Sequence, residues 1–209
     1  MKKIIIFDFD GTLVDSLHIF VNVFNEHASE FGFKQIDSDE VKILQNKGYM
    51  EIIREYKVPL LKIPSLISRG QKAIYEKADE FTLFPGIHEV ITTLKKDNFT
   101  VGILTSNSKV NVEKILTHLD FMIFDFIYDE KNLFGKPAAF KNLLRSHKFN
   151  PQDVIYVGDE VRDIEAARKN NVECIAVTYG FNTKEILEKN NPTYVANSPQ
   201  DIVKIIRTT

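Results

Sequence analysis

The sequence lacks the features that mark secreted and membrane proteins. Its 209 residues include a single cysteine, Cys174, which excludes an intramolecular disulfide and fits a reducing compartment. Because Cys174 lies in an apolar run, we expect a buried structural thiol. No run approaches the roughly 20 apolar residues that span a bilayer, and the apolar run at 4–7 is too short for a signal peptide. We therefore expect a soluble, cytoplasmic protein.

The sequence also lacks an excess of either charge. Lys and Arg number 27 against 29 Asp and Glu, which gives a formal net charge of -2. This balance excludes a bulk attraction to nucleic acid or to an anionic membrane, so any anion binding must be local. The histidines lie far apart and show no metal-ligand spacing. Nothing in the sequence indicates an obligate protein partner.

Apolar runs and helical patterns alternate along most of the chain. Strand-like runs lie at 4–7, 99–104, 123–128, 154–157, 173–178 and 193–196. Helical patterns between the later runs occupy 87–96, 109–118, 137–147, 164–169, 183–188 and 199–207. This alternation predicts an α/β fold, a Rossmann-like and mostly parallel sheet with helices on both faces.

One long segment interrupts the alternation because it contains helical patterns only. The expected helices are 17–31, 38–45, 49–56 and 60–77, with Gly48, Pro59 and Pro64 separating them. Pro85-Gly86 then marks the return to alternating strands and helices. We predict a helical cap domain at 15–83, inserted after the first strand into a core domain formed by 1–14 and 84–209.

Polar side chains gather just after the predicted strands. They are Asp8, Asp10 and Thr12 after the first strand, Thr105, Ser106 and Asn107 after the second, and Asp159, Glu160 and Asp163 after the fourth, with Lys136 between Gly135 and Pro137. Ligands of open α/β sheets bind outside the carboxyl ends of the strands. Carboxylates converging there repel one another unless a hard cation such as Mg²⁺ lies among them. A lysine and hydroxyl donors beside such an ion suit a phosphoryl group.

Asp8 and Asp10 can share the chemistry, because residues two apart leaving a strand can face the same pocket. One carboxylate can attack phosphorus, while the other protonates the departing alcohol oxygen and later activates water. An isolated pair of this kind is more often a turn or a helix cap. The other polar groups at the strand ends favour the catalytic interpretation.

Four segments together resemble the motifs of the haloacid dehalogenase superfamily, specifically its phosphoglycolate-phosphatase-like members with a small helical cap. The segments are Asp8-Phe9-Asp10-Gly11-Thr12-Leu13, Gly102-Ile103-Leu104-Thr105, Gly135-Lys136-Pro137 and Gly158-Asp159-Glu160-Val161-Arg162-Asp163. Their order and strand-end placement agree over nearly the whole chain. Dehalogenases of the superfamily lack the second acid, so Asp10 favours phosphate-ester chemistry.

The resemblance implies roles for the acids. Asp8 matches the nucleophile that becomes an aspartyl phosphate, and Asp10 matches the general acid-base. Mg²⁺ would be held by the carboxylates of Asp8 and Asp159 and the backbone carbonyl of Asp10. Asp163 would orient metal-bound water or Lys136. Glu160 is either a further ligand or a glutamate that favours a helix N-terminus.

The resemblance also implies phosphate ligands. Lys136 matches the cation that restrains the nucleophile and the phosphate. Thr105 matches the phosphate-binding hydroxyl and is preferred over Ser106, although either could instead cap the following helix. Ser106 and Asn107 are expected to line the same pocket.

The sequence indicates the residues that recognise the substrate less clearly than the catalytic ones. Lys47 and Arg54 are candidates in the cap, although a solvated helix face explains both, and His18 follows the Asp8 loop. The leading hypothesis is a Mg²⁺-dependent phosphatase acting on a small phosphorylated metabolite, with phosphoglycolate one candidate among sugar phosphates and nucleotides. Alternatives are a phosphomutase of the β-phosphoglucomutase type and a non-enzymatic phospho-acceptor or binding protein. In receiver domains the phosphorylated aspartate follows the third strand, whereas Asp8 follows the first.

Overall fold

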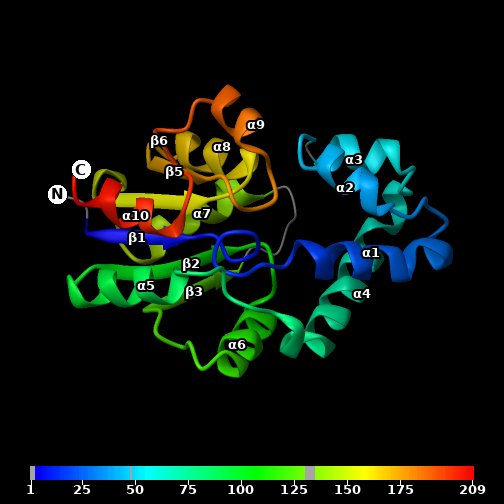
Figure 1. Ribbon diagram of the computed structural model, residues 1–209, viewed down its shortest axis with the longest axis horizontal. Coiled ribbons are helices and arrows are strands. Elements are labelled where there is room, and N and C mark those ends of the chain that lie inside the picture. Colours follow the sequence, from blue (N-terminus) through cyan, green and yellow to red (C-terminus); the bar gives the residue numbers. More distant parts are fainter. Residues whose placement is uncertain (1–2, 48, 130–134) are drawn as a thin grey trace.

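The centre of the fold is a parallel sheet. The computed structural model describes residues 3–47, 49–129 and 135–209, and Figure 1 shows its layout. Its six-stranded sheet has the order β3-β2-β1-β4-β5-β6, and every pair of neighbours is parallel. The strands are β1 (Ile4–Phe7), β2 (Thr100–Thr105), β3 (Phe126–Asp129), β4 (Val154–Gly158), β5 (Glu173–Val177) and β6 (Tyr194–Ala196). The predicted α/β fold is therefore confirmed.

β1 occupies the middle of the sheet because both of its faces are apolar. Ile5 and Phe7 belong to the hydrophobic cluster on one face, and Ile4 and Ile6 to the cluster on the other. Side chains alternate between faces along a strand, so a strand covered on both sides reads as one continuous apolar run. Phe7 is in register with residue 103 of β2 and with residue 157 of β4. Three strands therefore end side by side.

Helices cover both faces of the sheet (Figure 1). The helices that supply buried residues to the cluster containing Ile5 and Phe7 include α5 (Ile87–Lys96), α6 (Lys109–His118) and α10 (Pro199–Ile206). Those that supply the cluster containing Ile4 and Ile6 are α7 (Lys136–Ser146), α8 (Val161–Lys169) and α9 (Lys184–Lys189). The sheet is thus the middle layer of three.

The chain between β1 and α5 is helical and lies beyond the carboxyl ends of the central strands (Figure 1). It contains α1 (Leu17–Phe31), α2 (Val41–Leu44), α3 (Tyr49–Glu55) and α4 (Ile63–Glu76), with 3₁₀ turns at Ser38–Glu40, Leu60–Lys62 and Ala78–Glu80. These elements share a separate apolar cluster, formed by Ala28, Phe31, Phe33, Leu44, Tyr56 and Val58. The predicted helical insertion after the first strand is confirmed.

The two connections between this insertion and the sheet run side by side. Val14 and Leu83 form an antiparallel bridge. Asp15 N donates to the Thr82 carbonyl at 2.9 Å, and residue 84 N donates to residue 13 O at 3.0 Å. The division into a core of 1–14 and 84–209 and a cap of 15–83 stays a prediction.

Some element boundaries differ from the expectations. β3 begins at Phe126 rather than at 123, because the Asp125 carboxylate accepts the Val101 N–H at 2.7 Å that a longer ladder would use. Pro64 does not separate two helices, since it lies in the first turn of α4, where its missing N–H is not needed. Gly48, another of the three predicted separators, lies outside the described residues. In the described ranges, no helix is both long and apolar enough to cross a membrane.

Candidate active site

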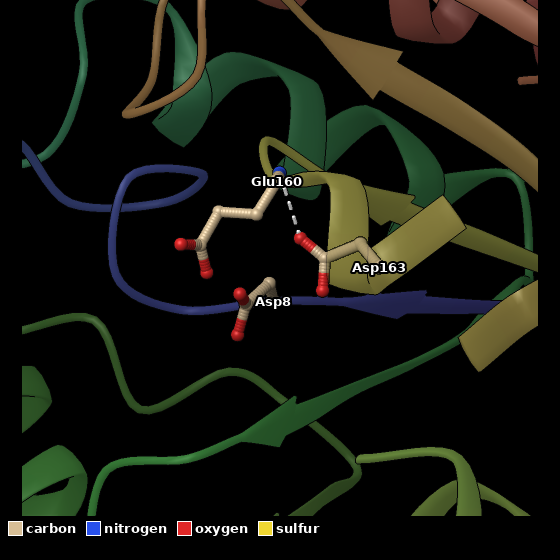
Figure 2. A group of neighbouring side chains, drawn as sticks. All are labelled: Asp8, Glu160 and Asp163. Atoms are coloured by element: carbon tan, nitrogen blue, oxygen red, sulfur yellow. Dashed lines mark hydrogen bonds between the residues drawn. The ribbon is translucent and has the colours of Figure 1, made fainter. Parts of the chain in front are cut away.

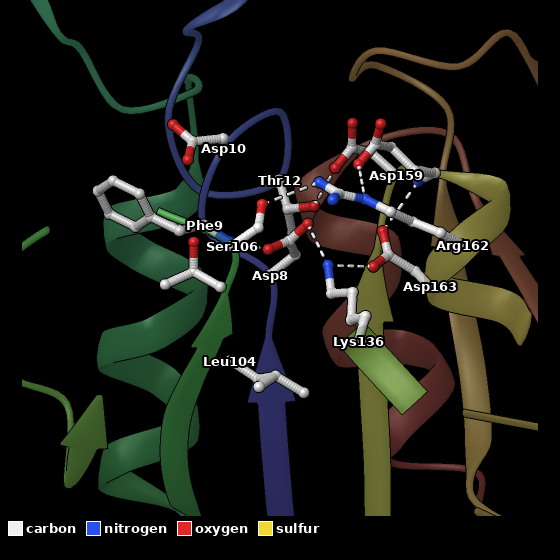
Figure 3. Close-up of polar contacts among 12 residues, drawn as sticks. Asp8, Phe9, Asp10, Thr12, Leu104, Ser106, Lys136, Asp159, Arg162 and Asp163 are labelled. Carbon is white, nitrogen blue, oxygen red and sulfur yellow. Dashed lines mark hydrogen bonds and ion pairs between the residues drawn. The ribbon is translucent and has the colours of Figure 1, made fainter. Parts of the chain in front are cut away.

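The polar residues predicted from the strand ends meet at the carboxyl edge of the sheet (Figure 3). Asp8 follows β1, Thr105 ends β2, and Asp159 follows β4, while Lys136 is the first residue of α7. All four side chains are buried. The common register of β1, β2 and β4 brings residues that are far apart in sequence into one site.

Asp8 is held through both of its carboxylate oxygens. Oδ1 accepts from the Phe9 N–H at 2.8 Å, and Oδ2 accepts from Lys136 Nζ at 2.7 Å. Burial raises the pKa of Asp8 to about 6, while Lys136 acts in the opposite direction. The carboxylate is therefore fixed in orientation and ionised above that pH, as a nucleophile must be.

Lys136 joins Asp8 to Asp163. Its ammonium forms an ion pair with Asp163 Oδ1, which also accepts from the Tyr156 hydroxyl at 3.3 Å. Burial acts to lower the pKa of Lys136, but Asp163 and Asp8 outweigh it and the pKa is raised. At Gly158 a Cβ would lie 2.4 Å from Asp163 Oδ2, so β4 needs glycine at its end. Whether Asp163 orients Lys136 or metal-bound water stays a prediction.

Asp10 lies in a different environment from Asp8. Its Oδ2 accepts from Asn107 Nδ2 at 3.1 Å, and its buried Oδ1 makes no hydrogen bond of good geometry with the described residues. Burial and, secondly, the nearby Asp8 raise the pKa of Asp10 to about 7, although Asn107 and the Ser16 hydroxyl act to lower it. A carboxyl with this pKa can both give and take a proton near neutral pH.

Hydrogen bonds connect Asp10 to helix α4. Asn107 Oδ1 accepts from Asn111 Nδ2 at 3.0 Å, and Asn111 Nδ2 also donates to Gln71 Oε1 at 2.7 Å. Gln71 Oε1 accepts a second bond from Ser108 N at 3.1 Å. Asn107 and Asn111 are both buried. A side chain of the helical insertion therefore supports the residue that orients Asp10.

Asp159 is packed against two backbone segments. Its Oδ1 accepts from Thr12 Oγ1 at 2.7 Å, and its Oδ2 accepts from Phe181 N at 2.7 Å. A Cβ at Gly11 would lie 2.2 Å from Asp159 Oδ2, and one at Gly180 would lie 2.4 Å from Asp159 Cβ. Burial, followed by Glu160 and other acids nearby, raises the pKa of Asp159 well above its usual value. An ionised Asp159 needs a compensating cation.

Three carboxylates approach one another closely enough to share a metal ion: Asp8, Glu160 and Asp163 each place an oxygen within 4.8 Å of the others (Figure 2). Of the predicted ligands Asp8, Asp10 and Asp159, this set contains Asp8 alone, and it also contains Glu160, which the sequence indicated as a possible further ligand. Glu160 faces the site and accepts from Arg162 Nε at 2.5 Å. Which of these acids bind a metal stays a prediction.

The donor set nevertheless suits a hard divalent cation. Five buried acids meet at this edge, namely Asp8, Asp10, Asp159, Glu160 and Asp163. Among the described residues, the cations beside them are Lys136 and Arg162. Carboxylate oxygens are the ligands that Mg²⁺ prefers, and the excess of acids over cations would be balanced by such an ion.

The predicted phosphate ligands lie at the end of β2. Thr105 Oγ1 accepts from Asn107 N at 2.9 Å, and Ser106 Oγ accepts from Arg162 Nη2 at 3.1 Å. Each hydroxyl keeps its own proton to donate. The contacts place both residues at the site and do not decide between them.

The helical insertion and the sheet enclose a cavity of about 550 Å³ that reaches this site. Its lining includes Asp10, Ser106 and Asn107 at the strand ends, and Lys47 from the insertion. Lys47 is ion-paired with Glu55. Arg54 and His18 are exposed, and neither is among the described residues that line the cavity.

Sequence reasoning assigned no role to Thr12, Tyr156 or Arg162. Thr12 holds Asp159, Tyr156 supports Asp163, and Arg162 bridges Ser106 and Glu160. Thr12 and Arg162 lie within the motif segments at 8–13 and 158–163, and this position in the sequence could have indicated that they belong to the site. Tyr156 is buried in β4, and its hydroxyl there requires a polar partner.

The comparisons with known proteins agree with this geometry. Residues 5–177 match the haloacid dehalogenase-like hydrolase family. The chain is 34% identical over 203 residues to a phosphoglycolate phosphatase from Synechococcus elongatus, which covers 97% of this chain and 96% of that protein. It is 25% identical over 221 residues to a phosphoglycolate phosphatase from Vibrio parahaemolyticus, covering 98% of this chain and 96% of that protein.

A solved structure shows the same fold. A crystal structure described as a predicted phosphatase from Clostridium acetobutylicum superposes with a TM-score of 0.89 at 24% identity and covers 100% of both chains. The sequence motifs, the parallel sheet and the matches over most of the chain lead to one assignment. The chain belongs to the haloacid dehalogenase-like hydrolase family.

Proposed function

We propose that this hydrolase is a Mg²⁺-dependent phosphatase that removes phosphate from a small phosphorylated metabolite through an aspartyl phosphate on Asp8. The observation that supports it most is the buried Asp8 carboxylate, bonded to Lys136 at 2.7 Å in a site that also contains Asp10. The relatives named as phosphoglycolate phosphatases support phosphomonoester hydrolysis and make phosphoglycolate the first substrate to test.

The reaction follows from the two acids. An oxygen of Asp8 forms a bond to phosphorus as the phosphorus–oxygen bond to the alcohol breaks, and Asp10 gives its proton to the departing oxygen. Asp10 then takes a proton from water, whose oxygen attacks the same phosphorus. The bond to Asp8 breaks, and the products are inorganic phosphate and the original carboxylate. A pKa of about 7 suits Asp10 to both proton transfers.

The remaining residues would orient and neutralise the phosphoryl group. Lys136 and a hydroxyl of Thr105 or Ser106 would bind its oxygens, with Asn107 beside them. Asp8, Asp159 and the Asp10 carbonyl would hold Mg²⁺, which when bound neutralises negative charge on the phosphoryl oxygens. Asp163 would keep Lys136 in place through their ion pair.

The test is Mg²⁺-dependent release of phosphate from a generic aryl phosphate by the wild type, Asp8→Asn and Asp10→Asn. Asp79→Asn, at an exposed position, is the matched control and should keep wild-type activity. We expect Asp8→Asn to lose at least about 10³-fold in kcat. The Asp10 variant should lose about 10²- to 10⁴-fold, the usual contribution of a general acid-base.

Other outcomes would contradict the proposal. Metal-independent activity, or full activity of the Asp8 variant, would exclude the mechanism. Isomerisation of a hexose phosphate without net phosphate release would favour a phosphomutase. A stable phosphorylated protein that never turns over would favour a phospho-acceptor. A panel of phosphorylated metabolites, with phosphoglycolate included, would then identify the substrate.

A further inference from the structure

The cavity beside Asp10 has two chemically different ends. At the strand ends its wall is polar and includes Asp10, Ser106 and Asn107. Away from the strand ends the wall is formed by side chains of the helical insertion that are mostly aliphatic or aromatic, among them Leu17, Phe20, Phe24, Ile52, Leu66 and Ile67. A phosphate bound at the polar end would direct the rest of the substrate towards the apolar end.

The wall is continuous between the insertion and the sheet domain. Phe20 of α1 packs edge-on against Phe181, with ring centroids 5.9 Å apart, and both line the cavity. Phe181 is also the residue whose N–H binds Asp159 at 2.7 Å. The apolar end of the cavity, which we call the apolar chamber, is therefore directly connected to the site.

Charged leaving groups would find little compensation in this chamber. Among the described residues that line it, Lys47 is the only cation, and its ammonium is already paired with Glu55. A carboxylate or a second phosphate loses its hydration on entering this chamber and must find a cationic partner there. An apolar group enters at no such cost and gains from leaving water.

The chamber is also larger than a two-carbon acid needs. The whole cavity, of which the chamber is the apolar part, has a volume of about 550 Å³, within the range of pockets that hold drug-sized ligands. We propose that the preferred substrate is a phosphomonoester of an extended apolar alcohol, with an alkyl or aromatic leaving group. This inference rests on the proposed phosphatase function and specifies its substrate class.

A homologous series of n-alkyl phosphates tests the inference. Ethyl, butyl and hexyl phosphate carry the same reacting group on alcohols of nearly equal acidity, so kcat/KM along the series reports burial of the chain. We expect kcat/KM to rise about fourfold for each added methylene, the usual value for a buried CH₂. A flat or falling series, with phosphoglycolate preferred to hexyl phosphate, would overturn the inference.

A substitution that fills the chamber links the series to this cavity. Gly70 of α4 lines it, and the nearest atom to a Cβ there would be Val23 Cγ1 at 3.9 Å, which leaves room for a side chain. Gly70→Leu should abolish the gain in kcat/KM from ethyl to hexyl phosphate, so that the ratio of the two values falls to about one. Ser68→Leu adds the same side chain at an exposed position of the same helix and should retain the full series. If kcat/KM rose along the alkyl phosphate series in Gly70→Leu as it does in the wild type, the alkyl chain of the substrate would bind elsewhere and the inference would be refuted.

The same assays distinguish failure of the inference from failure of the proposed function. Mg²⁺-dependent activity that Asp8→Asn abolishes, combined with no chain-length preference, would leave the phosphatase in place and reject the apolar substrate. Hydrolysis of ethyl phosphate that Asp8→Asn does not affect would reject the proposed function itself. Thermal unfolding of Gly70→Leu checks that it folds, because a leucine in place of a helical glycine should not lower the melting temperature.

Discussion

Lys136→Met should destabilise the protein strongly and in a pH-dependent manner. The ammonium of Lys136 contacts Asp8 Oδ2 at 2.7 Å and pairs with Asp163 Oδ1, and its side chain is 2% exposed. Methionine has a similar length but cannot form either contact, so two acids are left without their cation. Removing one partner of a buried ion pair typically costs about 3–5 kcal/mol, which is the loss we expect in the free energy of unfolding at pH 8.

The loss should shrink as the pH falls. Lys136 lowers the pKa of Asp8, which burial brings to about 6, so its removal raises that pKa further. Above pH 6, Asp8 then keeps its proton in the folded variant but has lost it in the folded wild type. The free energy of unfolding of the variant therefore falls more steeply with rising pH than that of the wild type. At pH 5 Asp8 is mostly protonated in both proteins, so only the interaction with Asp163 is lost. The destabilisation at pH 5 should therefore be smaller.

Urea unfolding in EDTA at pH 5 and pH 8 measures both quantities. Lys95→Met is the matched control, because Lys95 pairs with Asp125 at 2.6 Å in a partly exposed position and should cost at most about 1 kcal/mol. Adding Asp163→Asn to Lys136→Met should recover part of the stability by removing one of the unpaired acids. A loss below about 1 kcal/mol at pH 8, or an equal loss at both pH values, would refute the reasoning.

Three further outcomes follow from individual contacts. Gly11→Ala should lower the free energy of unfolding by about 1–3 kcal/mol and reduce kcat, because Gly11 has φ +78° and a Cβ would meet Asp159 Oδ2; urea unfolding that matches wild type would contradict this. The pKa of Asp10 is raised to about 7 in the folded protein without metal. The folded state therefore holds a proton on Asp10 that the unfolded state releases near pH 4, so the free energy of unfolding falls as the pH rises from about 4 to 7. Added Mg²⁺ should therefore raise the melting temperature more at pH 8 than at pH 5, and an equal shift would count against metal binding here. Gln71→Met removes the side-chain oxygen that accepts from Asn111 Nδ2 and Ser108 N, while the Gln71 backbone carbonyl still accepts from Asn111 Nδ2 at 2.9 Å. It should lower kcat about fivefold at unchanged KM, whereas Gln71→Glu keeps a side-chain acceptor and should restore kcat. The opposite split between kcat and KM would exclude this positioning role.

The architecture could be predicted because its signals are local. The runs that became β1, β4 and β5 are apolar on both faces, and such runs alternating with helical patterns favour a parallel sheet. The start of β3 was missed because it depends on the Asp125 carboxylate replacing a ladder contact of Val101, which no local pattern reveals. Pro64 was misinterpreted because a proline has opposite effects in the first turn and in the interior of a helix.

The sequence could predict which residues lie at the site better than which of them contact one another. The rule that ligands bind at the carboxyl ends of parallel strands selected Asp8, Thr105 and Asp159 without any knowledge of distances. It could not show that Glu160 and Asp163 place their oxygens within 4.8 Å of each other and of an Asp8 oxygen. That arrangement depends on the turn before α8 and on the bond from Glu160 N to Asp163 Oδ2 at 3.0 Å. The apolar chamber likewise forms only when helices of the insertion pack together.

The central position of β1 has a consequence for synthesis on the ribosome. Its residue Ile4 pairs with residue 100 on one side and residue 154 on the other, so both partners are made long after β1 itself. At about 5–20 residues per second, the second partner follows on the order of 10–30 s later. Until β2 is made, β1 is an apolar segment with two unpaired edges, and one edge stays unpaired until β4 is made; unpaired edges of this kind promote aggregation. Of the six strands of this sheet, the one that leads to the proposed nucleophile is made first, and it gains its second neighbour only when β4 has been made.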